Sequence, residues 1–378
     1  MRDAISRALF HATADTRASV TLPTATAGAA AGAVVRVATA GALGGVVSWA
    51  AVFVAVILVS AASAAAPGAD GASGPSRSGP PLPVALKGRP DQRERMPAKE
   101  LFGHQREAAP LRPAAIGFYS RGCLAGAERL EIDGPAWQAM RLSRNRHWGH
   151  PKLVRLVRRL ASDAKKLDGW PGLLVGDMSQ PRGGPMLTGH RSHQIGLDAD
   201  IWFTPMPSRR LSWRERERKS AVSMLAADRL SVNADVWTLA HARLIRRAAS
   251  YPETERVLVH PAIKKALCEG AEKLGGDRSW LAKVRPYWGH HYHFHLRIGC
   301  PPGSAGCRAQ KPVTGDDGCK EELAYWYQQL TRPKPRVAAP ARKVRPRPPL
   351  TLAGLPAECR GVLDAQRIVA PAPVPAQR

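Results

Sequence analysis

The sequence WGHHYHFHLR at residues 288–297 has the most informative pattern in this chain. Four of its ten residues are histidine, whereas the whole chain of 378 residues contains 12. In a β-strand, alternate side chains lie on opposite faces. One face of this expected strand holds Tyr292, Phe294, Leu296 and Ile298, and the other holds His291, His293, His295 and Arg297. This pattern predicts a metal or catalytic site at the edge of a hydrophobic core.

A second stretch, GHRSHQIGLDAD at residues 189–200, supplies carboxylates. After Gly196 the apolar and polar residues alternate again, so Asp198 and Asp200 lie on one face of a second expected strand, just after His193. Imidazole and carboxylate groups are ligands of catalytic zinc, which leaves one coordination position for water. We expect the two strands to hold the two halves of one zinc site.

Each half is a weak signal by itself, and a structural cluster of histidines is the simpler interpretation of either one. The two halves together, with further histidines beside each, favour a catalytic metal. Zinc lowers the pKa of a bound water and polarises a carbonyl group, while a nearby base moves the proton. A closed structural zinc site is disfavoured, because the sequence has no CxxC pair and such a site would leave the surplus histidines unexplained.

The N-terminal part resembles an export signal. Residues 38–66 carry no charge, residues 49–59 are nearly all apolar, and small residues follow at 61–67. We therefore predict that residues 1–66 are a signal peptide with a long n-region, which also leaves open a true start downstream of Met1. An uncleaved membrane anchor is the alternative, but the short apolar part ending in alanines favours cleavage.

Composition then divides the rest of the chain. Residues 67–97 are rich in Gly, Pro, Ser and Arg and are predicted to be a flexible linker. Residues 98–330 are expected to form a single catalytic domain, and residues 331–378 a Pro-rich basic tail.

Within the domain, periodicity predicts helices at 151–167, 237–249, 261–274 and 321–330, and strands at 172–178, 197–203 and 256–260. His241 is interpreted as a packed or solvated residue, and His260 as a capping or packing residue. The expected fold class is α+β, with a mainly antiparallel sheet that carries the zinc site and helices packed outside it.

The net charge of +26 comes from 56 Lys and Arg against 30 Asp and Glu. Basic runs such as residues 342–347 are usually solvated, although they also attract polyanions, which for an exported protein are the cell wall or an anionic membrane surface. Nucleic acid is not an expected partner, because the sequence has no basic platform interleaved with aromatic residues. The six cysteines predict three disulfides in an exported chain, with 15 connectivities open from spacing alone.

Several stretches resemble the penicillin-insensitive murein endopeptidases, which belong with lysostaphin-like, D-Ala-D-Ala-cleaving and hedgehog-related zinc proteins. The resemblance covers about residues 98–365. Its matching stretches are AKELFG at 98–103, GHP at 149–151, GDM at 176–178, GHRSHQIGLDAD at 189–200, VHPAIKKALC at 259–268, WLAKVRP at 280–286 and HHYHFHLR at 290–297. The combination GHxSHQxGLDxD with HxxHxHxR is highly specific.

The resemblance implies a role for each residue of the site. The zinc ligands would be His193, Asp200 and His295, with His190 as a further ligand. His293 would be the general base, and His290 would stabilise the tetrahedral intermediate. His291 would be an ordinary neighbour, and Asp198 would orient a ligand.

Two further features follow from the resemblance. Some members bind a second zinc at a dimer interface through an Asp and a His three residues later. Asp228 matches the first position, but Ser231 occupies the second, which puts that zinc and the dimer in doubt. The implied disulfides are Cys123–Cys359, Cys268–Cys319 and Cys300–Cys307, and the first would pin the basic tail.

The implied function is hydrolysis of D-alanyl–meso-diaminopimelyl cross-links of peptidoglycan in the periplasm of a Gram-negative-type envelope. The alternatives are a D,D-carboxypeptidase, an L,D-endopeptidase, or a non-catalytic zinc-dependent module that binds the wall. His293 and His290 favour an enzyme, because a binding module needs no base. The membrane is an expected partner only if the N-terminal segment is uncleaved.

Overall fold

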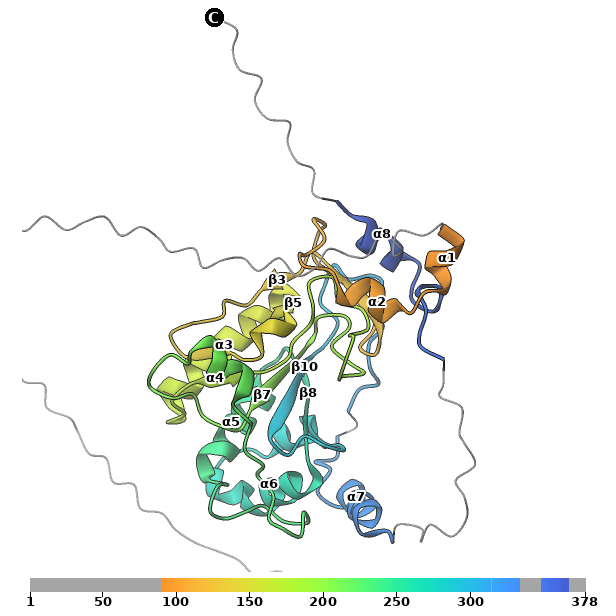
Figure 1. Cartoon of the computed structure of the whole chain (residues 1–378). Coiled ribbons are helices and arrows are strands. Elements are labelled where there is room, and N and C mark those ends of the chain that lie inside the picture. Colours follow the sequence, from red (N-terminus) through yellow and green to blue (C-terminus); the bar gives the residue numbers. More distant parts are fainter. Residues whose placement is uncertain (1–89, 314, 334–347, 367–378) are drawn as a thin grey trace, which may run out of the picture. The chain divides into compact units, whose positions relative to one another are not determined.

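The computed structural model of the protein describes residues 90–313, 315–333 and 348–366 (Figure 1). The predicted signal peptide and most of the predicted linker lie outside these residues. Among the described residues, no helix has the length and apolar character needed to cross a membrane. Helix α1 (Pro90–Arg95) falls inside the range predicted as linker, and α2 (Ala98–Gly103) follows it.

The centre of the fold is a six-stranded sheet. Its strands, in spatial order, are β4 (Trp137–Ala139), β6 (Leu173–Val175), β7 (Asp198–Trp202), β10 (His293–Ile298), β8 (Thr254–Val259) and β9 (Val284–Pro286). The pairs β6–β7, β7–β10 and β10–β8 are antiparallel, while the outer pairs β4–β6 and β8–β9 are parallel. The sheet is therefore mixed, and the prediction of a mainly antiparallel sheet is wrong.

Two helical crossovers explain the parallel pairs. Helix α3 (Pro151–Leu167) lies between β4 and β6 in the chain, and α6 (Pro261–Leu274) lies between β8 and β9. A helix that returns the chain across the sheet makes the strands on either side of it parallel. The sequence pattern predicted both helices with these bounds, but it did not predict the three-residue strands β4 and β9.

Both helices begin with the same N-terminal cap. The side chains of His150 and His260 each accept a hydrogen bond, at 3.2 Å, from the backbone N–H two residues later, and a proline occupies the first helical position. This arrangement satisfies a backbone donor that the helix leaves unpaired. The prediction that His260 acts as a cap is thus confirmed. His241 is also a packing residue, because its ring lies 4.9 Å from that of Trp170.

The remaining elements surround this sheet. Helices α5 (Leu239–Ser250) and α7 (Glu321–Thr331) lie close to their predicted ranges. Helix α4 (Trp213–Arg218) is a short helix between β7 and α5. Two small antiparallel pairs join β1 (Ala114–Phe118) to β2 (Arg121–Ala125) and β3 (Glu128–Arg129) to β5 (Trp148–Gly149). The 3-10 helices among the described residues are η2 (Leu142–Arg144), η3 (Ser279–Lys283) and η4 (Leu352–Gly354).

The sheet has one apolar and one polar face at its centre. Ala199 and Ile201 of β7 and Phe294 and Leu296 of β10 are fully buried in the main core, together with apolar residues of α3, α5 and α6. These helices therefore cover the apolar face (Figure 1). The opposite face carries the charged and imidazole side chains. Tyr292 is 39% exposed and precedes the strand, so its predicted place on the core face is wrong.

The described part of the C-terminal tail is attached to the domain. The three disulfides are Cys123–Cys359, Cys268–Cys319 and Cys300–Cys307, the same pairs that the family resemblance implies. Helix α8 (Glu358–Asp364), which the sequence pattern did not predict, packs in a second hydrophobic cluster with α2 and β2. An ion pair between Arg360 and Glu94 also links α8 to α1.

Replacing Cys123 and Cys359 together with serine should lower the free energy of unfolding by about 2 to 5 kcal/mol, because this disulfide restricts a long loop in the unfolded chain. The matched control replaces Cys300 and Cys307, which are separated by 7 residues instead of 236. Its loss should be smaller, since less loop entropy is involved. Urea unfolding followed by tryptophan fluorescence measures both variants, and an equal or larger loss in the control would contradict the prediction.

Candidate functional site

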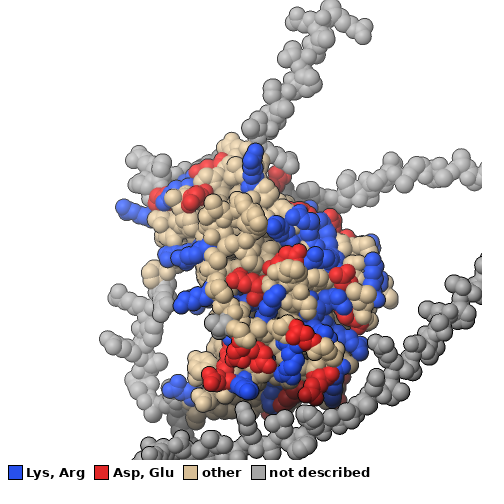
Figure 2. Space-filling view, turned by 180° about the vertical axis from the view of Figure 1, so that it is seen from behind, with Lys and Arg blue, Asp and Glu red and all other residues tan. Residues whose placement is uncertain are grey.

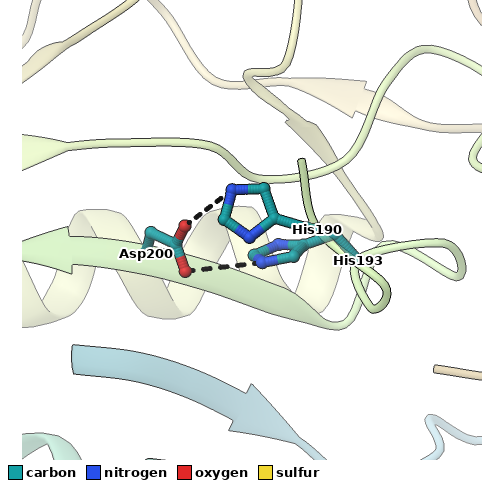
Figure 3. A group of neighbouring side chains, drawn as sticks. All are labelled: His190, His193 and Asp200. Atoms are coloured by element: carbon teal, nitrogen blue, oxygen red, sulfur yellow. Dashed lines mark ion pairs between the residues drawn. The ribbon is translucent and has the colours of Figure 1, made fainter. Parts of the chain in front are cut away.

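Four imidazole rings converge on the carboxylate of Asp200. The Nε2 atoms of His193 and His293 each lie 3.4 Å from its Oδ1, and the Nδ1 of His295 lies 3.7 Å from the same oxygen. The Nε2 of His190 lies 3.4 Å from Oδ2. Figure 3 shows His190 and His193 reaching from their loop toward Asp200 on β7.

The pairing of β7 with β10 creates this arrangement. Within that antiparallel pair, His295 is opposite Asp200 and Arg297 is opposite Asp198. Residues on the same face of opposed strands have Cβ atoms about 5 Å apart. The two histidine-containing stretches, distant in the sequence, therefore form one cluster, as the sequence pattern predicted.

The loop before β7 places His193 in the cluster. His193 itself has a positive φ of 68°, and Gly196 follows with a φ of 69°. A Cβ at Gly196 would lie 2.4 Å from Cδ2 of Leu124, so this turn has no room for a side chain. Non-glycine residues in this backbone region cost free energy and are often found at functional sites.

The carboxylate of Asp198 contacts two histidines of the cluster. It is fully buried, its Oδ2 accepts a hydrogen bond from the backbone N–H of His193 at 3.1 Å, and its Oδ1 lies 3.0 Å from Nε2 of His295. The guanidinium of Arg297 donates to the same carboxylate at 2.6 Å. Burial alone would raise the pKa of Asp198, but the charge of Arg297 and the contact with His295 outweigh it and lower the pKa. Asp198 is therefore ionised, and its carboxylate holds the ring of His295 and the backbone of His193.

The buried polar atoms of the cluster lack hydrogen-bond partners. These atoms are Oδ1 of Asp200, Nε2 of His193, Nδ1 of His293 and Nε2 of His295, whose contact with Asp198 lacks hydrogen-bond geometry. Unpartnered buried polar atoms are rare and call for an explanation such as an ion. Two ligand atoms about 2.0 Å from a tetrahedral ion lie about 3.3 Å apart, close to the observed separations from Asp200. The residues present therefore fit a metal ion.

Burial also sets the protonation of the two strand histidines. It lowers the pKa of His293 to about 4 and that of His295 to about 3, although the nearby carboxylates oppose the shift. Both rings are therefore neutral at pH 7. A neutral imidazole is the form that binds a metal or accepts a proton.

The other sequence-predicted residues lie at different distances from this centre. The ring of His290 is 5.2 Å from that of His293 and 5.7 Å from that of His295, which places it beside the cluster. His291 points elsewhere, with its Nδ1 2.9 Å from Oγ of Ser223. Asp228 is exposed, and its carboxylate accepts hydrogen bonds from the backbone of residues 230 and 231.

A cavity of about 270 Å³ opens onto the cluster. Its lining includes His190, Asp200, His293, Arg141, Arg144, Asp177, Trp202 and Tyr292. The sequence pattern did not single out Arg141, Arg144 or Tyr292 as site residues. Asp177 belongs to the GDM stretch of the resemblance, which is the signal that could have identified it.

Asp177 links His190 to two arginines. Its Oδ2 lies 3.2 Å from Nε2 of His190 and accepts hydrogen bonds from Arg144 and Arg146, each at 2.9 Å. Burial by itself would raise the pKa of Asp177, but the contact with His190 and the charges of Arg146 and Arg144 hold it at about 2. The ionised carboxylate therefore orients His190 toward Asp200.

The mixed sheet and this buried cluster place the chain among α/β enzymes that carry a histidine–aspartate site on one face of a sheet. Sequence comparison then identifies the family. The penicillin-insensitive murein endopeptidase family matches residues 115–364, and the chain belongs to this peptidase family.

Individual relatives agree with this assignment. A penicillin-insensitive murein endopeptidase of Haemophilus influenzae is 42% identical over 236 residues, which are 62% of this chain and 79% of the relative. Proteins of the same name from Klebsiella pneumoniae and Escherichia coli are 39% and 38% identical, and the matches cover 66% and 68% of this chain and 86% and 89% of those relatives.

The variant Arg297→Met should lower the free energy of unfolding by about 3 to 5 kcal/mol, because it leaves the fully buried Asp198 carboxylate without its cation. The matched control is the double variant Asp198→Asn/Arg297→Met, which removes both charges and should recover part of the loss. Urea unfolding in the presence of a chelator measures both and keeps metal binding out of the comparison. A double variant no more stable than Arg297→Met would contradict the prediction.

Proposed function

We propose that the chain is a zinc peptidase that hydrolyses the cross-links of peptidoglycan at the bond between D-alanine and meso-diaminopimelate. The observation that carries this proposal is the convergence of four imidazole rings on the carboxylate of Asp200, beside a cavity, in a member of the murein endopeptidase family. Peptidoglycan is accordingly the proposed substrate, and the periplasm the proposed location.

The proposed zinc ligands are His193, Asp200 and His295, with His190 as a further ligand. When bound, zinc polarises the scissile carbonyl group and lowers the pKa of a water molecule. His190 also lines the cavity, so it lies where substrate enters. Asp198 and Asp177 hold the ligand rings in position through the contacts described above.

The chain itself supplies the groups that move protons and bind charge. His293 lines the cavity and is proposed to accept a proton and later to donate it to the leaving amine. His290, beside it, is proposed to stabilise the negative charge that develops on the carbonyl oxygen. These two residues favour an enzyme over a non-catalytic module that binds the wall.

The charges on one face of the protein do not have the distribution that is usual for nucleic-acid binding. On the face drawn in Figure 2, Lys and Arg side chains are interspersed with Asp and Glu. A protein that binds nucleic acid usually gathers its basic side chains in one patch or stripe. The second zinc at Asp228 and a dimer bridged by it are not part of the proposal, because Ser231 is not a zinc ligand.

Purified protein should convert cross-linked muropeptide dimers to monomers, and a chelator should abolish this activity until zinc is restored. Mass spectrometry of the products measures the bond that is cut. Persistence of the dimers under zinc-replete conditions would exclude the proposed function. Loss of a terminal D-alanine alone would instead indicate a D,D-carboxypeptidase, and cleavage at another bond an L,D-endopeptidase.

The variants His293→Ala and His295→Ala should separate the proposed base from a proposed ligand. His293→Ala should retain bound zinc and lose at least about a hundredfold in kcat, as expected for removal of a general base. His295→Ala should lose zinc, because one of its ligands is gone. Zinc content by plasma emission spectroscopy and turnover of the dimer measure the two effects. Equal loss of zinc in both variants would contradict the assigned roles.

A further inference from the structure

Two arginines line the cavity that also contains Asp200 and His293. Arg141 and Arg144 come from the segment around η2, which precedes both histidine-containing stretches in the chain. Arg141 and Asn145, on either side of this short helix, both have positive φ values, of 56° and 52°. Arg144 donates to Asp177, but Arg146 donates to the same carboxylate, so the proposed metal site by itself does not account for Arg144 or Arg141 at this cavity.

Arg141 is held as a fixed positive charge. Its guanidinium donates to the carbonyl oxygens of Arg216, Glu217 and Lys219, at the end of α4. Among the described residues, no carboxylate forms an ion pair with it. Its guanidinium carbon also lies 5.5 Å from the centre of the Trp202 ring, which lines the same cavity. Arg141 therefore lines the cavity without a carboxylate partner among the described residues.

Arg144 is the more accessible of the two. Its side chain is 44% exposed, and its Nη1 donates to Oδ2 of Asp177. That carboxylate is shared with Arg146 and His190, so one negative charge faces two guanidinium groups. Arg141, Arg144 and Asp177 all line the cavity, so this part of its lining has two guanidinium groups against one carboxylate. Guanidinium groups are well suited to recognise carboxylates, because their parallel N–H donors match the two oxygens.

The proposed substrate carries a carboxylate close to the scissile bond. In a bond between D-alanine and meso-diaminopimelate, the carbon attached to the scissile nitrogen carries a free carboxylate. That group is therefore only two bonds from the nitrogen that His293 is proposed to protonate, and His293 lines the same cavity as Arg144.

We propose that Arg144, with the fixed charge of Arg141 beside it, binds the substrate carboxylate on the amine side of the scissile bond. This inference rests on the proposed function and specifies the substrate further. It makes Arg144 a specificity-determining residue. Arg144 would select peptides in which the carbon attached to the scissile nitrogen carries a free carboxylate and not a carboxamide. Arg141 contributes charge to this subsite, while its donors hold the loop to α4.

The test compares two cross-linked dimers, one with the free carboxylate at that carbon and one with a carboxamide. The zinc-loaded wild-type protein should have the higher kcat/KM for the free carboxylate. Arg144→Gln should lower kcat/KM for that dimer by about ten- to a hundredfold and change it little for the carboxamide dimer, since a charge-assisted hydrogen bond is lost only with the former. Arg144→Lys keeps the charge but loses the parallel N–H donors of the guanidinium group. Its kcat/KM for the free-carboxylate dimer should therefore lie between those of the wild-type protein and Arg144→Gln.

One control variant and one comparison of the two dimers separate recognition from a structural effect. Arg159→Gln removes an arginine of nearly equal exposure, 43% against 44%, which pairs with Glu253 and does not line the cavity. It should leave the preference between dimers unchanged. If Arg144 merely stabilised Asp177 and His190, its replacement would lower the activity on both dimers by the same factor, and this result would overturn the inference.

The outcomes for this inference and for the proposed function are distinct. Cleavage of the dimers by Arg144→Gln with the wild-type preference intact overturns the role of Arg144 and leaves the proposed function standing. Cleavage of neither dimer by the zinc-loaded wild-type protein overturns the proposed function and this inference with it.

Discussion

The antiparallel pairing of β7 with β10 is the constraint on which the whole site depends. It places His295 opposite Asp200 and Arg297 opposite Asp198, although each pair is separated by more than ninety residues in the chain. A shift of one residue in this register would turn the imidazoles toward the core and Phe294 and Leu296 toward the cavity. The register is therefore fixed by the same core that the helices cover.

Each carboxylate around the site has its own cation. Asp200 lies at the centre of the cluster, Asp198 forms an ion pair with Arg297, and Asp177 forms an ion pair with Arg146. A buried carboxylate is costly unless cations and hydrogen-bond donors surround it. The outer carboxylates and their arginines thus hold the rings of His295 and His190 without competing for the centre. This construction leaves two groups whose ligand atoms lie within 4.8 Å of one another, His190 with His193 and Asp200, and His193 with Asp198 and His295, and either group could hold a metal ion.

The cavity adds a function that the cluster alone does not have. Its wall joins the cluster to Arg141 and Arg144, which come from a different part of the chain. The cluster supplies groups for hydrolysis, and the arginines supply charge for recognition. Because the loop that carries them is fixed to α4 by backbone carbonyls, the positive wall is preorganised before any substrate arrives.

Local pattern was enough to determine much of this protein. Helices α3 and α6, strands β7 and β10, and the residues of the central cluster followed from periodicity, from motif spacing and from the family resemblance, because those signals lie within short stretches. The parallel outer strands, helix α8 and the arginine wall did not follow. Strands β4 and β9 have three residues each, too few for a periodic signal, and their pairing depends on partners far along the chain. Arg144 has no local feature that separates it from the many other basic residues, and only the folded chain places it in the cavity that His293 also lines. Long-range contacts of this kind are decided by tertiary packing, which a linear pattern does not record.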